Sequence, residues 1–304
     1  MTQLSIGGII PPVVTPLTGG SELDRESFFR IIDHMIAGGV NGLFLLGSTG
    51  EWVNLPAGTC NEVVVQGVKA AKGRLPVFVN ISDSSLVELH RKAEDAASLG
   101  ADCLVISPPS YFAMTQDELR RFFELAIKGV PLPVLLYNAP QYARTAIAPE
   151  TVMALAGHDH VMGIKDSSGD LDYLGRLIRT RPPTDFSILT GSELQFWESF
   201  RMGCQGGVCG GANLFPRLYS DFFNAMPEGD PDRINHFQVL INRIHEVVYD
   251  GFSTTLSHII GLKYLMEIRG LCRSDMALPV YNELSLRQKK NMAALLDDFL
   301  TRGY

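Results

Sequence analysis

A lysine at the end of an apolar run is the residue of this chain best suited to covalent chemistry. Lys165 follows Val161, Met162, Gly163 and Ile164, a run that predicts a buried β-strand. A lysine carried into a protein interior loses hydration, which favours its neutral form, and the neutral amine is the form that attacks a carbonyl carbon. The alternative for such a lysine is a structural ion pair with a neighbouring carboxylate. Its position in the sequence is compatible with both roles.

Hydroxyl groups stand at the ends of three apolar runs. Residues 47–51 read Gly-Ser-Thr-Gly-Glu, and backbone N–H groups in such a turn can hold a carboxylate. No Gly-Lys-Ser/Thr follows, so this is not a phosphate-binding Walker loop, and a tight strand-to-helix turn would also explain the glycines. Tyr137 ends another run, where its hydroxyl can relay a proton or satisfy a hydrogen bond. Ser167 and Ser168 follow Lys165 and can either bind a hydroxylated substrate or cap the next helix.

The elements that must position these residues alternate along the chain. Short β-rich runs, mostly apolar throughout, recur at about the 30-residue length of a βαβ unit. Eight such units predict a (β/α)8 TIM barrel, because doubly wound open sheets more often have about five to seven strands. Catalytic groups of such barrels gather at the carboxyl ends of the strands. The predicted strands cover residues 9–14, 42–46, 77–80, 103–107, 134–138, 161–165, 187–190 and 206–209.

Helical patterns fill the intervening segments and the end of the chain. Residues 24–37 carry an apolar stripe that ends at two glycines, and Thr115 with Glu118 has the spacing of a capping box. After a turn-rich joint at 227–232, apolar residues from Ile234 to Val248 step at helical spacing. We therefore expect two parts, a catalytic barrel over residues 1–225 and a C-terminal helical extension over residues 226–304.

Composition excludes several classes of function. The 304-residue chain has a formal net charge of −7, which gives no electrostatic reason to bind nucleic acid. No apolar run reaches the roughly 18 residues of a membrane span, so no membrane association is expected. The five cysteines are odd in number and fit neither a zinc site nor a redox pair. With an opening segment unlike a secretory signal, these thiols predict a cytoplasmic protein.

Taken together, the strand ends resemble those of the dihydrodipicolinate synthase and N-acetylneuraminate lyase family. The Gly-Ser-Thr-Gly-Glu turn at 47–51, Tyr-Asn-x-Pro at 137–140 and Gly-Ile-Lys-Asp at 163–166 carry the resemblance, which runs through essentially the whole chain. It implies a Schiff-base, pyruvate-dependent class I aldolase with a (β/α)8 barrel. It also implies a homotetramer built as a dimer of dimers, without metal or organic cofactor.

The resemblance also implies catalytic roles at matching positions. Lys165 matches the lysine that forms the Schiff base with the 2-oxo acid, and Tyr137 matches the tyrosine that shuttles protons. Ser48 and Thr49 match the hydroxyl residues that bind the pyruvyl carboxylate and link Tyr137 to the proton relay. Tyr111 matches the tyrosine that enters the relay of a neighbouring subunit.

Two further positions, Gly191 and Val208, match residues that line the pyruvyl group. The sialic acid lyases of the family carry an acidic pair shortly after this glycine, whereas the present chain keeps one acid, Glu193. The synthases place an arginine two residues after the proline of Tyr-Asn-x-Pro. Here that position is Tyr142, and Arg144 arrives two residues later.

These departures determine the expected substrates. Residues 165–170 are similar to the corresponding run of 2-keto-3-deoxy sugar acid aldolases and 4-hydroxy-2-oxoglutarate aldolases. This resemblance implies that Ser167 of the present chain binds a hydroxylated aldehyde. The expected partners are a small 2-oxo acid and an aldehyde, and the expected function is a lyase that cleaves or forms 2-keto-3-deoxy sugar acids or 4-hydroxy-2-oxo acids. The alternatives are 4-hydroxy-tetrahydrodipicolinate synthase, a 2-keto-3-deoxy sugar acid dehydratase and a non-catalytic protein that binds a 2-oxo acid.

Feedback inhibition by lysine is not expected. Regulated members of the family carry two histidines and an asparagine around bound lysine, and this chain has Ala57, Cys60 and Ser84 at those positions. Only Glu88 is retained.

Overall fold

The computed structural model describes residues 6–19, 21–182, 185–249, 257–273 and 283–304. Eight short strands lie at its centre, and three of them have the predicted bounds. They are β1 (Gly8–Ile9), β2 (Leu43–Leu45), β3 (Val77–Asn80), β4 (Cys103–Ile106), β5 (Val134–Asn138), β6 (Val161–Asp166), β7 (Ser187–Thr190) and β8 (Gly206–Gly207).

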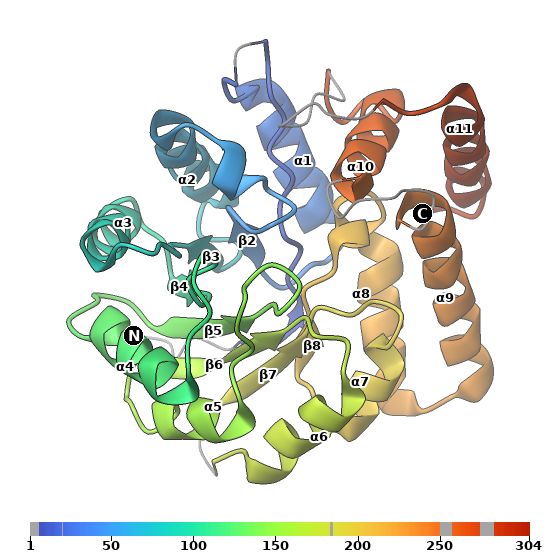
Figure 1. Ribbon diagram of the computed structural model, residues 1–304. Helices are drawn as coiled ribbons and strands as arrows, with labels where there is room; N and C mark the ends of the chain where they lie inside the picture. Colours follow the sequence, from blue (N-terminus) through green and yellow to red (C-terminus); the bar gives the residue numbers. More distant parts are fainter. Residues whose placement is uncertain (1–5, 20, 183–184, 250–256, 274–282) are drawn as a thin grey trace.

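The strands form one parallel sheet that closes on itself. Their order is β1-β8-β7-β6-β5-β4-β3-β2, and every neighbouring pair is parallel. A parallel bridge between Pro12 and Phe44 joins the segment after β1 to β2. Figure 1 shows the strands at the centre of a ring of helices. The predicted (β/α)8 barrel is confirmed.

The first and last strands are shorter than predicted. Pro11 and Pro12 have no N–H to donate, so the ladder beyond β1 is interrupted, although Val13 N still donates to the Phe44 carbonyl at 2.8 Å. After β8, Val208 N donates to the Thr190 carbonyl at 2.8 Å. The chain then enters the 3-10 turn η2 (Gly210–Asn213) instead of continuing as a strand.

Each strand is followed by a helix on the outside of the barrel. Asp24 caps the first helix by accepting from Ser27 N, and Thr115 and Glu118 form the predicted reciprocal capping box. The barrel helices are α1 (Arg25–Ala37), α2 (Ala57–Ala71), α3 (Leu86–Ser98), α4 (Gln116–Ile127), α5 (Pro149–Leu155), α6 (Leu171–Thr180), α7 (Phe196–Met202) and α8 (Pro216–Ala225), with the short η1 (Trp52–Asn54) before α2.

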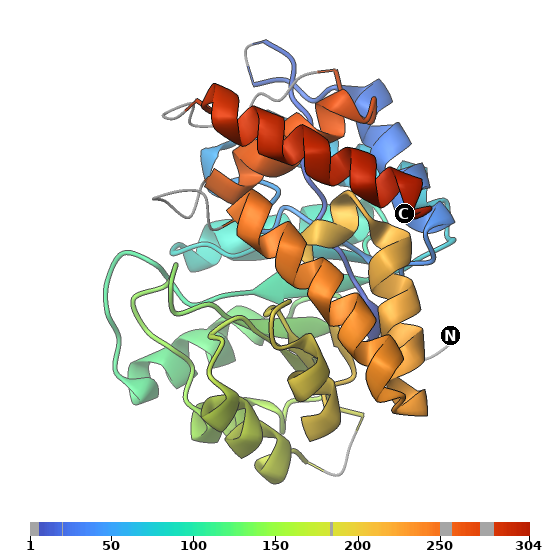
Figure 2. The same cartoon turned by 90° about the vertical axis from the view of Figure 1, so that its right-hand side faces the viewer.

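The C-terminal extension consists of helices, as predicted, but its first long helix changes geometry. An α-helix ends at Ile244 and a π-helical turn continues to Tyr249, where the apolar spacing predicts an uninterrupted α-helix. The segments are η3 (Met226–Glu228), α9 (Pro231–Ile244), η4 (His245–Tyr249), α10 (Ser257–Ile268) and α11 (Leu286–Thr301). Figures 1 and 2 show them packed on one side of the barrel, beside α1 and α8. The division at residue 225 stays a prediction.

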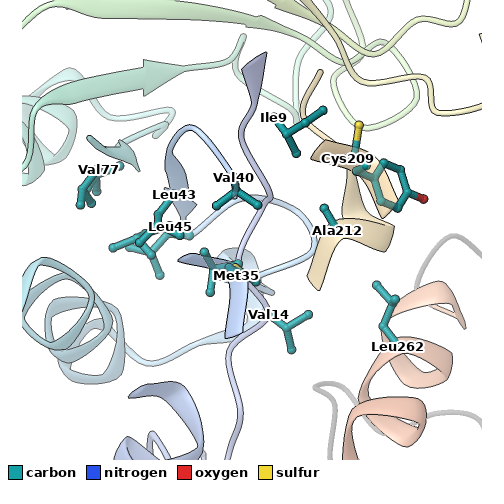
Figure 3. Packing of buried hydrophobic residues seen from close by; sticks show 14 of the residues in the cluster. Ile9, Val14, Met35, Val40, Leu43, Leu45, Val77, Cys209, Ala212 and Leu262 are labelled. Carbon is teal, nitrogen blue, oxygen red and sulfur yellow. The ribbon is translucent and has the colours of Figure 1, made fainter. Parts of the chain in front are cut away.

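Two apolar clusters follow from the alternation of side chains along the strands. Phe44, Phe78, Leu135 and Tyr137 belong to the cluster inside the barrel, whereas their strand neighbours pack outward against the helices. Figure 3 shows part of this outer cluster, in which Leu262 of α10 joins Val14 and Ala212 of the barrel. The extension therefore shares the outer core of the barrel. In the described ranges, no helix is both long and apolar enough to cross a membrane.

Candidate active site

Lys165 and Tyr137 lie side by side inside the barrel. They are register partners on β6 and β5, and the two residues are 5% and 6% exposed. The Lys165 Nζ atom lies 4.1 Å from the centroid of the Tyr137 ring and 5.0 Å from that of the Phe44 ring. No carboxylate of the described residues forms an ion pair with Lys165, so in that part of the chain the ion-pair alternative has no support.

The surroundings of the Tyr137 hydroxyl favour its ionised form. Burial alone raises the pKa of a phenol, but the charge of Lys165 and hydrogen bonds with Ser48, Ser167 and Lys165 outweigh burial, so the pKa of Tyr137 is lowered. A phenol with a lowered pKa exchanges its proton more readily near neutral pH. This hydroxyl therefore connects three side chains that the sequence singled out separately.

A cavity of about 310 Å³, here named the Lys165 cavity, contains seven of the eight predicted site residues. They come from the carboxyl ends of five strands, as expected for a (β/α)8 barrel. They are Ser48, Thr49, Tyr137, Lys165, Ser167, Gly191 and Val208.

The turn that carries Ser48 and Thr49 is held from both sides. Gly50 N donates to the Gly47 carbonyl and Glu51 N to the Ser48 carbonyl, each at 3.0 Å. The Thr15 hydroxyl donates to the Gly50 carbonyl at 2.9 Å. A Cβ atom on Gly50 would lie 2.9 Å from the Val13 carbonyl oxygen, so only glycine fits without displacing that backbone.

The two serines after Lys165 do not cap the next helix. Asp170 is the N-cap of α6 and accepts from Tyr173 N, while the Ser168 hydroxyl donates to Asp166 at 2.8 Å. Ser167 lines the Lys165 cavity. A Cβ atom on Gly191 would lie 2.1 Å from Ser167 Oγ, so the glycine leaves the space that this hydroxyl occupies.

Tyr111, the eighth predicted residue, lies away from the Lys165 cavity. Its side chain is 74% exposed and packs edge-to-face on Phe112, which is equally exposed, with ring centroids 4.8 Å apart. A neighbouring cavity of about 350 Å³ shares Ser48, Tyr137 and Tyr142 with the Lys165 cavity. Residues 107–110, just before Tyr111, line this neighbouring cavity.

The two residues that depart from the synthase pattern lie in different environments. Tyr142 lines both cavities, and burial, with a smaller contribution from Tyr137, raises its pKa to about 12. Arg144 is exposed and lines neither cavity. Among the described residues, no arginine contributes to the wall of either cavity.

Glu193, the single acid after Gly191, is engaged by the protein itself. It accepts a hydrogen bond from the Tyr219 hydroxyl and one from Gly211 N at 3.0 Å. Burial raises its pKa, and these hydrogen bonds offset the rise only in part. The side chain therefore braces the turn after β8.

Sequence reasoning missed the contribution of the extension to this site. His245 and Tyr249, both in the π-helical turn η4, line the Lys165 cavity. Turns of this kind occur often at functional sites, but the apolar spacing of residues 234–248 shows no sign of one. No cluster of three or more His, Cys, Asp or Glu side chains able to hold a metal was found in the described part of the chain.

Comparison with known proteins places this site in a family. The model of the dihydrodipicolinate synthetase family matches residues 5–299. A 4-hydroxy-tetrahydrodipicolinate synthase of Jannaschia sp. is 31% identical over 273 residues, which are 90% of this chain and 91% of that protein. An uncharacterized DapA-like lyase of Halobacterium salinarum is 29% identical, over 91% of this chain and 89% of its own length.

Solved structures agree with the sequence relatives. A dihydrodipicolinate synthase from Bacteroides thetaiotaomicron has a TM-score of 0.92 and 38% identity, covering 98% of this chain and all of that one (100%). YagE of E. coli K12 is a prophage protein of the dihydrodipicolinic acid synthase family, solved in complex with pyruvate. Its structure has a TM-score of 0.90 and 27% identity, and the match covers 98% of this chain and 99% of YagE. The protein therefore belongs to the dihydrodipicolinate synthetase family of lyases, as the three motifs predict.

Proposed function

We propose that the protein is a pyruvate-dependent class I aldolase that forms a Schiff base between Lys165 and a 2-oxo acid. The observation that carries this proposal is the pairing of a buried lysine, without a carboxylate partner among the described residues, with a tyrosine of lowered pKa. The presence of pyruvate in the YagE structure supports the choice of 2-oxo acid.

The chemistry follows from the groups in the Lys165 cavity. The Lys165 amine attacks the carbonyl carbon of the 2-oxo acid, and loss of water gives a protonated imine. This cation withdraws electrons from the adjacent carbon, so loss of a proton there, or cleavage of the C–C bond to an aldehyde, gives an enamine. In the synthetic direction the enamine adds to the aldehyde. Tyr137 carries the protons, and Ser48 and Thr49 hold the carboxylate of the 2-oxo acid.

The preferred aldehyde is hydroxylated or uncharged in this proposal. Recognition of a second carboxylate favours a bidentate arginine, and among the described residues neither cavity has one. Ser167 and Tyr142 instead present hydroxyl groups, and His245 presents an imidazole. We therefore favour 2-keto-3-deoxy sugar acids or 4-hydroxy-2-oxo acids over the condensation of pyruvate with aspartate semialdehyde.

We also propose that the protein is a homotetramer in which Tyr111 completes the site of a neighbouring subunit. The adjacent rings of Tyr111 and Phe112 are each 74% exposed. Adjacent apolar groups exposed to water are typical of a surface that another protein covers. Their loop continues directly from residues that line the neighbouring cavity. This placement suits a contact between copies close to the site.

Reductive trapping tests the covalent step. Borohydride added with pyruvate should attach one pyruvyl-sized mass to the protein, on Lys165, and Lys165→Ala should prevent the labelling. Peptide mass spectrometry identifies the modified residue. Labelling of another lysine, or an unlabelled wild-type protein, would refute the proposed mechanism.

A further inference from the structure

A fully buried ion pair joins the C-terminal extension to the turn that carries Ser48 and Thr49. The Lys263 Nζ atom on α10 contacts Glu51 Oε2, and both side chains are 0% exposed. The other ion pairs between described residues lie at the surface, where at least 27% of each side chain is exposed. This pair is therefore unlike the rest.

Stability alone is a poor explanation for such a pair. Removing two charges from water costs free energy that their attraction often fails to recover, so apolar residues of similar volume usually stabilise a fold as well or better. Leu262, next to Lys263, already packs in the apolar core that α10 shares with the barrel. We therefore consider a role for the pair in the neighbouring turn, which carries Ser48 and Thr49.

Glu51 belongs to the turn that is proposed to bind the substrate carboxylate. It closes the turn, since its N–H donates to the Ser48 carbonyl at 3.0 Å and its own φ is +61°. It also belongs to the wall of the neighbouring cavity, together with Ser48 and Tyr137. An uncompensated carboxylate at this position would repel the carboxylate of a 2-oxo acid held by Ser48 and Thr49.

We propose that Lys263 neutralises Glu51 and thereby allows the turn to bind an anionic substrate. Lys263 acts through Glu51 and is a positioning residue, not a catalytic one. The inference rests on the proposed function, because it assumes that the carboxylate of the 2-oxo acid binds at Ser48 and Thr49. At an effective dielectric constant of about 20, Coulomb's law gives roughly tenfold or more weaker binding of an anion when a like charge within about 10 Å is left unneutralised.

Charge variants separate this role from a structural one. The rate of labelling by limiting borohydride is measured against pyruvate concentration for the wild type, Lys263→Met, Glu51→Gln and the double variant. Lys263→Met should raise the half-saturating pyruvate concentration roughly tenfold or more with a similar limiting rate. The double variant, which is neutral again, should return to within about threefold of the wild type, and Glu51→Gln alone should bind pyruvate at least as tightly as the wild type.

The matched control breaks an ion pair elsewhere in the extension. Arg243→Met removes the contact with Asp298, which is 2.7 Å long and partly exposed, and should leave the half-saturating concentration unchanged. Normal pyruvate binding by Lys263→Met, or a double variant as weak as Lys263→Met, would overturn the inference. If Lys263→Met does not fold, Glu51→Gln still decides, because weaker binding than the wild type contradicts the proposed charge effect. An unlabelled wild type would instead refute the proposed function, and the inference with it.

Discussion

Replacing Tyr137 by phenylalanine isolates one hydroxyl group of the site. The ring is retained, and with it the edge-to-face contact with Phe44 at 6.4 Å between centroids and the position beneath the Lys165 Nζ atom, 4.1 Å from the ring centroid. What is lost is the hydroxyl that interacts with Ser48, Ser167 and Lys165. The variant should therefore fold with little change in the barrel interior.

Two magnitudes separate the catalytic role from the structural one. Loss of a buried hydrogen bond lowers the free energy of unfolding by about 1 kcal/mol. Loss of a positioned acid–base group lowers the rate about 10²–10⁴-fold, which corresponds to roughly 3–5 kcal/mol of activation free energy. A large fall in rate with a small fall in stability is the expected result for Tyr137→Phe.

The assay does not require the identity of the aldehyde. An enamine formed on Lys165 exchanges the methyl protons of pyruvate with solvent, so NMR in D₂O reports proton transfer directly. Tyr173→Phe is the matched control, because the Tyr173 hydroxyl is also buried and donates to the Ile147 carbonyl at 2.7 Å, outside the Lys165 cavity. Wild-type exchange in folded Tyr137→Phe, or equal slowing in both variants, would refute the reasoning.

The pH profile gives a second check on the same hydroxyl. Burial opposes ionisation, but Lys165 and the hydrogen bonds outweigh it and lower the pKa of Tyr137 from its ordinary value. The phenolate therefore forms at lower pH than in a free phenol. If this group accepts the proton, exchange should rise with pH along a limb centred below about pH 10, and Tyr137→Phe should lack that limb.

Three further predictions concern the rest of the site. Gly191→Ala should slow the exchange of the pyruvate methyl protons by about tenfold or more, because the new Cβ atom would lie 2.1 Å from Ser167 Oγ and 3.3 Å from Lys165 Cε. In a Ser167→Ala background the same substitution should slow the exchange much less, and equal slowing in both backgrounds would contradict the clash. Tyr111→Ala, and dilution to monomers followed by sedimentation, should each reduce activity, whereas a fully active monomer would contradict the shared site. With pyruvate and aspartate semialdehyde, kcat/KM should stay below about 10⁴ M⁻¹s⁻¹, and millimolar lysine should have no effect on any turnover; efficient condensation or strong inhibition would overturn the respective prediction.

The strands could be predicted because buried parallel strands have a local signature. Residues 134–138 form a continuous apolar run that ends in a polar pair, and β5 has those bounds. The signature fails where backbone chemistry intervenes. The run after Ile9 is apolar, but its two prolines cannot donate to a ladder, so β1 ends after two residues.

The closeness of Lys165 and Tyr137 could be predicted because strand register does most of the positioning. Lys165 and Tyr137 each stand one residue before the end of a strand, and neighbouring parallel strands bring such residues together without help from loops. The partnership of Lys263 with Glu51 has no such signal. Those residues are distant in sequence, and although Lys263 stands among apolar residues, nothing in the sequence pairs it with Glu51.

The division of the site between barrel and extension explains why chemistry is easier to infer than substrate. The groups that would form the imine stand at strand ends, where short motifs mark them. Another part of the wall comes from η4. Its Tyr249 hydroxyl lies 3.2 Å from where a Cβ atom of Gly210 would be, and Glu193 Oε1 lies 3.5 Å from the same point. Glu193 is engaged with Tyr219 and Gly211, and Tyr249 also interacts with Glu193, so the side chains of this part of the wall hold one another in place. We therefore expect the choice of the second substrate to depend on this part of the wall, which no short sequence motif marks.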